Sequence, residues 1–249
     1  MDLGVTDRVA PLIEQVREMI NEEIAPLDAE FHTEVGKHPS GDRFKHTARQ
    51  LEILNGLKAE AQKRGLWNFW LTDSTRGYGL TTVEYAYLAE EMGKVPIAAE
   101  VFNCNAPDTG NMEVFMNFGT EAQKAEWLVP LLAGEIRSSY AMTEPQVASS
   151  DATNVQLSIR KDGDSWVLNG RKWFITGALY DRCKILIVMG KSDPENSSRH
   201  LQQSQILVPK NTPGVNIIRP LTTLGYDDAP LGHAEIVFDD VRVPLDNVL

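Results

Sequence analysis

Apolar residues in the first half of the chain recur every three or four positions, which is the period of an amphipathic helix. In residues 11–27 they fall on one helical face, and Pro26 is expected to end that helix because proline cannot donate the next backbone hydrogen bond. Further helices are predicted over residues 48–63, 81–92, 105–118 and 120–133. Residues 32–44 lack this period and contain glycine and proline, so they are predicted to form a loop.

From Ser138 onward the period changes to about 2, which indicates β-strands. The predicted strands are residues 140–143, 155–159, 165–168, 171–176, 184–190, 205–208, 215–218 and 234–238. A hairpin turn is predicted at residues 161–163, a second tight turn at Asn169-Gly170, and a polar loop at residues 192–204. The sequence therefore predicts an α+β chain, with an N-terminal all-α helical domain (residues 1–137) followed by an antiparallel β-barrel or β-sandwich domain (residues 138–249).

The charge of the chain narrows its possible partners. Its formal net charge is −11 and it contains no basic run, which argues against nucleic acid or an anionic membrane surface. We find no segment that approaches the length of a membrane span, and the N-terminal residues do not resemble a signal peptide. With 42% hydrophobic residues, we expect an ordered, soluble, intracellular protein.

Cysteine and histidine offer few candidates for chemistry. The two cysteines, Cys104 and Cys183, predict no disulfide framework and fit a reducing compartment. Cys104 is a possible nucleophile, although a packed thiol is the favoured interpretation. His32, His38 and His46 have no carboxylate or cysteine at ligand spacing, so we interpret them as solvated histidines and predict no metal site.

Residues 140–177 contain the residue types that suit a flavin. Small residues at 148–153 allow backbone N–H groups to approach an anion, so Ser149 or Ser150 is a candidate for holding a pyrophosphate. Thr143 and Thr176 are candidate hydrogen-bond donors to the polar edge of an isoalloxazine, and Phe174 is a candidate for covering a ring face. The alternative is that these are ordinary strand threonines, a strand aromatic and a serine-rich turn.

Three motifs in this region resemble the flavin-binding signature of the acyl-CoA dehydrogenase family. They are YAMTEP at residues 140–145, SSDATN at 149–154 and NGRKWFITG at 169–177. The similarity extends to GTEAQKAEWLVPLLAGE at 119–135 and FDDVRVPLDNVL at 238–249. APDTGN at 106–111 resembles the branch that includes the long- and very-long-chain "member eleven" type. The resemblance covers nearly the whole chain.

The resemblance implies FAD as the cofactor and assigns roles to particular residues. The implied cofactor-binding residues are Tyr140, Ala141, Met142, Thr143, Ser149, Ser150, Phe174, Ile175 and Thr176. The implied substrate-binding residue is Ser150. Arg199, with His200, is a further candidate for contacting the phosphates of CoA because both are cationic residues of the polar loop, and the alternative is an exposed loop that simply carries two cationic side chains. Two departures affect these roles. TEPQVASSD is one residue longer than the usual turn, and we favour Ser150 because it directly precedes the aspartate. Phe174 occupies the usual tryptophan position, which places Trp173 one residue earlier.

The resemblance also implies an activity, which is the α,β-dehydrogenation of a fatty acyl-CoA to a trans-2-enoyl-CoA in fatty-acid oxidation. The implied partners are an electron-transfer flavoprotein and further copies in a homodimer or homotetramer. The implied location is cytoplasmic in a bacterium and mitochondrial or peroxisomal in a eukaryote. The family's catalytic base lies in a C-terminal four-helix bundle, so we assign no catalytic residue and expect this chain alone to be inactive. The alternatives are a flavin oxidase or monooxygenase on the same scaffold, or a non-catalytic fragment.

Overall fold

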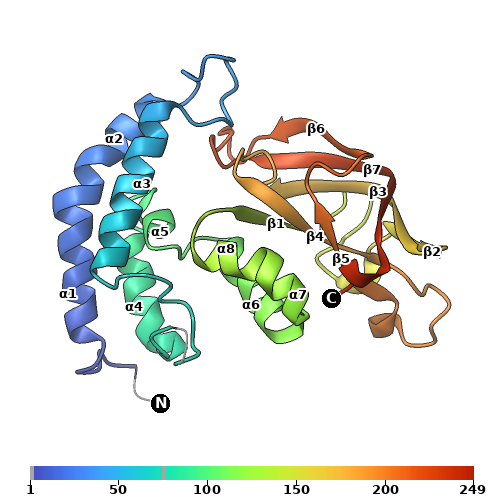
Figure 1. The fold of residues 1–249 in the computed structure, drawn as a ribbon, viewed down its shortest axis with the longest axis horizontal. Helices are drawn as coiled ribbons and strands as arrows, with labels where there is room; N and C mark the ends of the chain where they lie inside the picture. Colours follow the sequence, from blue (N-terminus) through green and yellow to red (C-terminus); the bar gives the residue numbers. More distant parts are fainter. Residues whose placement is uncertain (1–2, 75–76) are drawn as a thin grey trace. The chain divides into compact units, whose positions relative to one another are not determined.

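The computed structural model describes residues 3–74 and 77–249, and the chain divides into two compact units, Met1–Thr109 and Gly110–Leu249 (Figure 1). The first unit is helical. Its helices are α1 (Ala10–Met19), α2 (Ala25–Thr33), α3 (Ala48–Lys63), α4 (Thr82–Met92) and the short α5 (Ala98–Val101). Capping boxes at Thr47 and Thr81 fix the starts of α3 and α4, because each threonine and the residue three positions later satisfy one another's backbone N–H groups.

Pro26 does not end the first helix, so that part of the prediction is wrong. A π-helical segment, Ile20–Ile24, joins α1 to α2, and the backbone N–H of Ala25 donates to Ile20 O. Proline has no N–H, and its ring crowds the carbonyl of the preceding turn, so the wider π turn accommodates Pro26 without breaking the helix. The helix therefore continues to Thr33.

The second unit starts with helices and continues as a seven-stranded sheet (Figure 1). Its helices are α6 (Asp108–Phe118), which begins just before the division between the units, α7 (Glu121–Gln123) and α8 (Val129–Leu132). Another π-helical segment, Lys124–Leu128, joins α7 to α8 ahead of Pro130. The strands are β1 (Arg137–Ala141), β2 (Ser158–Asp162), β3 (Ser165–Thr176), β4 (Cys183–Lys191), β5 (Gln203–Pro209), β6 (Val215–Leu221) and β7 (His233–Pro244).

The strand order is β1-β4-β2-β3-β7-β6, and β5, which is not in this order, pairs with β4. The predicted fold class, helices followed by a β domain, is confirmed. The sheet is mixed rather than purely antiparallel, because β1 and β4 run parallel. Side chains such as Leu186, Ile236 and Phe238 fill its buried core. The domain boundary at residue 138 stays a prediction, while contacts within the structure group α6 to α8 with the sheet.

The prediction of a second tight turn is also wrong, because Asn169 and Gly170 lie inside the continuous strand β3. The pairing of β3 with β7 shifts register between Leu168 and Gly170, so this dipeptide forms a bulge. A Cβ atom on Gly170 would lie 2.9 Å from the Cα atom of Leu157, so only glycine lets the neighbouring backbone approach this closely.

The histidines and Cys104 have different outcomes. His32 is exposed, but His46 is buried against the Phe31 ring, so the prediction of a solvated His46 is wrong. Cys104 is a packed thiol, and burial raises its pKa to about 12. Across residues 3–74 and 77–249, we find no cluster of His, Cys, Asp and Glu suited to a metal ion. Within the same residues, every helix is too short or too polar to cross a membrane.

Candidate functional site

The segments predicted to carry the site lie next to one another in the second unit. Thr143 follows the end of β1, and its carbonyl oxygen accepts a 3.0 Å hydrogen bond from Trp173 N in β3. The Thr143 hydroxyl donates to Trp173 O at 2.7 Å. At the other end of β1, a Cβ atom on Gly177 would lie 3.4 Å from Ser138 O. The two segments therefore run side by side in opposite directions.

Phe174 occupies a second bulge in β3. The pairing with β7 shifts register between Lys172 and Ile175, and Phe174 lies at φ +50° within this shift. Its side chain is 42% exposed, and its ring meets that of Trp173 edge-on at 5.1 Å. A left-handed conformation is unfavourable for a bulky residue, and such strain concentrates at functional sites. The bulge thus holds an aromatic ring at the protein surface beside Thr143.

A buried ion pair, formed by Lys172 and Glu144, lies directly beside this bulge. Lys172 Nζ donates to Met142 O at 2.6 Å and to a Glu144 carboxylate oxygen at 2.8 Å. Glu144 also accepts from the backbone N–H groups of Gln156 and Leu157, both at 2.8 Å. Burial lowers the pKa of Lys172, and the interaction with Glu144 opposes that shift. The pair therefore ties the end of β1 to the approach to β2 and to β3.

The two candidate serines have different environments. Ser149 is buried, and its hydroxyl oxygen accepts from Glu144 N at 2.7 Å, so it holds the turn closed. Ser150 is exposed, and its hydroxyl has no hydrogen-bond partner among residues 3–74 and 77–249. The structure therefore leaves Ser150, and not Ser149, available to a ligand.

Arg199 lies close to this same turn. It belongs to the short 3₁₀ helix Arg199–Leu201 in the predicted polar loop, and it donates to the Asn154 side-chain oxygen at 3.2 Å. The hydrogen bond from the Thr153 hydroxyl is the main cause that lowers the pKa of Asp151, and Arg199 and His200 contribute to the same shift. Chain segments that are far apart in sequence thus bring Arg199 to the Ser150 turn.

The remaining predicted site residues divide by burial. Ala141 and Ile175 are buried, so they can meet a ligand only through their backbone. Tyr140 and Met142 are half-buried, and burial raises the pKa of the Tyr140 hydroxyl. Thr176 is half-buried and lies 3.0 Å from His233 Nδ1, measured from its hydroxyl oxygen. His233 and Asp228, which contacts His233, were not among the predicted residues.

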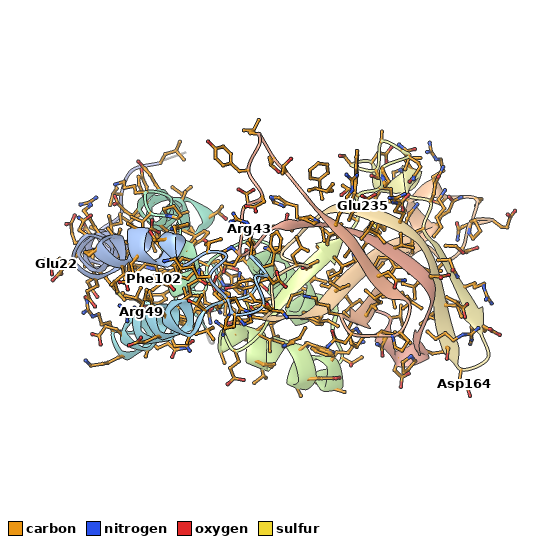
Figure 2. The ribbon with its side chains drawn as sticks, turned by 90° about the horizontal axis from the view of Figure 1, so that it is seen from above. Glu22, Arg43, Arg49, Phe102, Asp164 and Glu235 are labelled. Atoms are coloured by element: carbon orange, nitrogen blue, oxygen red, sulfur yellow. The ribbon has the colours of Figure 1, made fainter. Side chains whose placement is uncertain are left out.

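The buried glutamates of the chain are partnered, which makes them poor bases. Backbone and side-chain hydrogen bonds from Thr81 and Thr6 lower the pKa of Glu84. The hydrogen bond from Arg17 lowers the pKa of Glu91. Arg219 and Arg171 do the same for Glu235, which Figure 2 shows in the sheet unit. These carboxylates are therefore held in their charged, weakly basic form.

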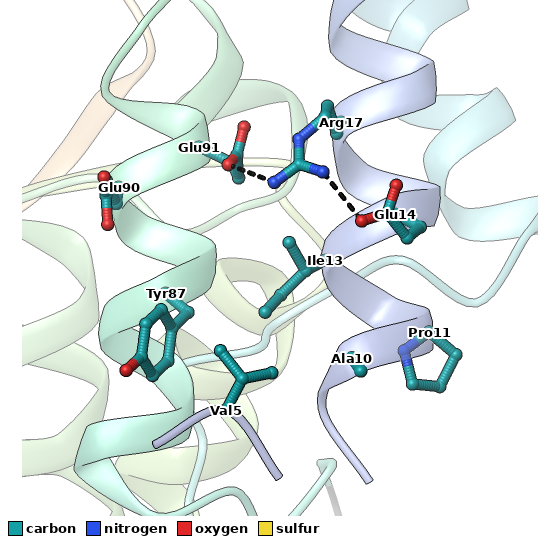
Figure 3. Close-up of a pocket in the computed structure, with 9 residues that line it drawn as sticks. All are labelled: Val5, Ala10, Pro11, Ile13, Glu14, Arg17, Tyr87, Glu90 and Glu91. Carbon is teal, nitrogen blue, oxygen red and sulfur yellow. Dashed lines mark hydrogen bonds and ion pairs between the residues drawn. The ribbon is translucent and has the colours of Figure 1, made fainter. Parts of the chain in front are cut away.

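A cavity of about 440 Å³ lies between α1 and α4 of the first unit, apart from the predicted site residues (Figure 3). Arg17 crosses it and pairs with Glu14 at 2.7 Å and Glu91 at 2.8 Å. Its other lining residues are mostly apolar and include Val5, Ile13 and Tyr87. Because Arg17 holds two of the three glutamates in ion pairs, we assign no chemistry to this cavity.

Comparison with known proteins gives a consistent result. The family described as "Acyl-CoA dehydrogenase, N-terminal domain" matches residues 6–135, and "Acyl-CoA dehydrogenase, middle domain" matches residues 139–241. Acyl-CoA dehydrogenase family member 10 of Mus musculus is 48% identical over 251 residues, covering 99% of this chain and 23% of that protein. Family member 11 of Gallus gallus is 48% identical over 237 residues, covering 94% of this chain and 30% of that protein.

The structural comparison agrees. A solved structure from Mycobacterium abscessus, assigned to the acyl-CoA dehydrogenases, superimposes with a TM-score of 0.88 and is 44% identical, covering 99% of this chain and 61% of that one. The chain thus spans only part of the length of the relatives it matches. The resemblance to the branch with member eleven is confirmed, and the chain belongs to the acyl-CoA dehydrogenase family.

Proposed function

We propose that this chain forms the flavin-facing part of an FAD-dependent acyl-CoA dehydrogenase. The observation that carries the proposal is the β3 bulge, which holds Phe174 at φ +50° with its ring exposed beside Thr143. Backbone strain of this kind concentrates at ligand sites, and an exposed aromatic face offers a surface against which a planar ring can stack.

The exposed ring and the polar groups of the site fit FAD, and the Thr143 hydroxyl, which donates its proton to Trp173 O, would accept a bond from the cofactor edge. Phe174 would lie against a ring face, while Thr143 and Thr176 would meet the polar edge of the ring. The exposed Ser150 hydroxyl would hold the pyrophosphate, because it has no partner among the described residues, whereas Ser149 is occupied in the turn. Bound FAD would supply the acceptor for the hydride that leaves the substrate.

The proposed substrate is a fatty acyl-CoA. Arg199 beside the Ser150 turn provides a cation on a chain whose net charge is −11, and guanidinium groups suit phosphate recognition. The proposed product is the trans-2-enoyl-CoA, and the proposed electron acceptor is an electron-transfer flavoprotein. We also propose a homodimer or homotetramer, located in the cytoplasm of a bacterium or in the mitochondria or peroxisomes of a eukaryote.

The base that removes the substrate's α-proton is proposed to come from outside these residues. Glu84, Glu91 and Glu235 are each held charged by hydrogen bonds or arginine partners. A general base contributes about 10²–10⁴-fold to a rate, so this chain alone should dehydrogenate its substrate extremely slowly.

The proposal is tested by titrating the chain with FAD and following flavin fluorescence. We expect Phe174→Ala to weaken FAD binding about 5- to 150-fold, since an aromatic stacking contact contributes roughly 1–3 kcal/mol in comparable ring-on-ring binding. Phe118→Ala, which removes another exposed phenylalanine, is the matched control and should have no effect. Equal affinity of the Phe174 variant and the unaltered chain would remove the basis for the proposal.

The position of the base is tested separately. A saturated acyl-CoA is added anaerobically to the FAD-loaded chain, and bleaching of the flavin absorption is followed. We expect only slow, incomplete bleaching. Fast, stoichiometric bleaching would show that a base lies within residues 1–249.

A further inference from the structure

Three side chains form a hydrogen-bonded chain at the end of β3. The Thr176 hydroxyl lies 3.0 Å from His233 Nδ1, and His233 Nε2 lies 2.8 Å from a carboxylate oxygen of Asp228. The His233 side chain is only 17% exposed, whereas that of Asp228 is 46% exposed. This row of hydrogen-bonded side chains thus runs from solvent at Asp228 to the predicted cofactor-binding residue Thr176.

The backbone holds these three residues in place. Thr176 and His233 are directly paired residues of β3 and β7. The carbonyl oxygen of Asp228 accepts a 2.9 Å bond from Gly232 N, and Gly232 O accepts a 2.9 Å bond from Gly177 N. The loop before β7 therefore folds back so that Asp228 meets the outer edge of the His233 ring.

The chemistry of the carboxylate fixes one ring proton. An ionised carboxylate can only accept, so His233 Nε2 must carry a hydrogen. The role of Nδ1 then depends on the charge of the ring. A neutral ring accepts the Thr176 hydroxyl proton at Nδ1, whereas an imidazolium donates to the Thr176 oxygen and forces its proton elsewhere. Among residues 3–74 and 77–249, His233 Nδ1 is the one acceptor within hydrogen-bonding distance of that hydroxyl, so only a neutral ring gives the Thr176 proton a partner within the protein.

We propose that Asp228 and His233 are positioning residues that fix the hydrogen-bond polarity of Thr176. His233, neutral and protonated at Nε2, takes the Thr176 proton, so the hydroxyl oxygen presents its lone pairs to the cofactor edge. Thr176 then acts as an acceptor and not as the donor expected from the sequence. Given the proposed function, on which this step rests, Thr176 would favour reduced FAD, whose ring edge carries an N–H group at N5.

The ring state is tested first on the ¹⁵N-labelled chain without FAD. Two-bond ¹H–¹⁵N correlation spectra separate the two neutral tautomers and the imidazolium, and His233→Phe identifies the His233 signals among those of the five histidines. We expect a protonated Nε2 and an unprotonated Nδ1. Asp228→Asn should partly convert the ring to the Nδ1-protonated form, because an amide can also donate to Nε2. An imidazolium or a protonated Nδ1 in the unaltered chain would overturn the proposal.

A matched control separates this arrangement from an ordinary histidine–carboxylate pair. His32 also lies beside an aspartate, with Nδ1 3.4 Å from a carboxylate oxygen of Asp28, but it lies in the first unit. His32→Phe should leave the His233 signals unchanged. Thr176→Val should leave Nε2 protonated and shift the Nδ1 signal, because it removes the bond to Nδ1.

The redox consequence is measured as the ratio of the affinities for reduced and oxidised FAD. We expect Thr176→Val and His233→Phe each to lower this ratio about tenfold, which corresponds to about 30 mV for a two-electron couple. Thr176→Ser should retain the ratio, and so should His32→Phe. An unchanged ratio in Thr176→Val with FAD bound would overturn the assigned polarity. Failure of the unaltered chain to bind FAD would instead refute the proposed function and its redox consequence, while the spectra still decide the ring state.

Discussion

Glu235 shows how a single side chain can be buried and still charged. It lies near the start of β7 and is buried. One of its carboxylate oxygens lies 2.6 Å from the guanidinium of Arg171, and the other lies 2.6 Å from that of Arg219. The hydrogen bond from Arg219 is the largest cause that lowers its pKa, and burial opposes that shift. The arginines remain partly exposed, so the charges are neutralised at the surface of the sheet.

The lowered pKa of Glu235 gives a pH-dependent contribution to stability. Because the pKa in the folded state lies below the ordinary value of 4.5, the contribution is present above pH 4.5 and is lost as the pH falls through the folded value. We expect Glu235→Gln to lower the free energy of unfolding at neutral pH by about 1–2 kcal/mol. The difference from the unaltered chain should shrink below pH 4.5.

Urea unfolding between neutral pH and pH 3 measures this difference. Glu195→Gln, at an exposed position of the loop before β5, should give nearly the same stability as the unaltered chain at every pH. A Glu235→Gln deficit that stays constant down to pH 3 would show that the deficit comes from packing and not from charge.

At the scale of elements, β2 and β4 meet through an unusually close backbone contact. Lys191 N donates to Leu157 O at 2.7 Å, and Ser158 pairs with Lys191 in parallel. A Cβ atom on Gly190 would lie 2.6 Å from both Leu157 O and Leu157 Cδ2. Glycine at this position therefore lets the two strands join into one sheet.

We expect Gly190→Ala to lower the free energy of unfolding by about 1–3 kcal/mol, because the added methyl group must push β2 away from β4. Gly110→Ala is the matched control in the same unit. It lies in α6, where a Cβ atom meets nothing within 4 Å, so it should be neutral or stabilise by about 0.5–1 kcal/mol. Urea unfolding of the two variants checks this, and equal effects would contradict the strand-contact argument.

The sequence predicted elements well where a periodic pattern was long. The long helices before residue 134 and the positions of the strands were expected, although α5 was not predicted, β3 was predicted as two strands, and β7 runs well past its predicted end. The errors came from residues that usually stop an element. Pro26 was absorbed by a π turn, and Asn169-Gly170 by a bulge, because neighbouring elements hold the chain in place there.

The candidate site was predictable only in part. The motifs identified the segments around Thr143, Ser150 and Phe174, since these are continuous in sequence. Glu144 and Lys172, which form the buried pair, are 28 residues apart in sequence, and no local sequence pattern predicts their contact. Asp228 and His233 lie close together in sequence, but only the pairing of β7 with β3 brings them to Thr176. Such contacts depend on strand register, which local patterns do not specify.

At the scale of the whole molecule, the net charge of −11 opposes the proposed ligands, because FAD and CoA are both anions. The Debye length falls from about 30 Å at 0.01 M salt to about 8 Å at 0.15 M. We therefore expect the association rate constant for FAD to rise over this range. Stopped-flow fluorescence measures it, and uncharged riboflavin is the control that should show little change. A rate that falls with salt would mean that the local field of Arg199 outweighs the net charge.

The paired serines of the lengthened turn have a consequence for how binding can evolve. Ser149 closes the turn through Glu144, whereas Ser150 faces outward with no partner among the described residues. Where one serine must serve both purposes, any change to its ligand contact also risks the fold. Here the two tasks are separate, so Ser150 can be substituted by other residues while Ser149 keeps the turn intact. Ligand preference at this turn can therefore drift across descendants without a matching loss of foldability.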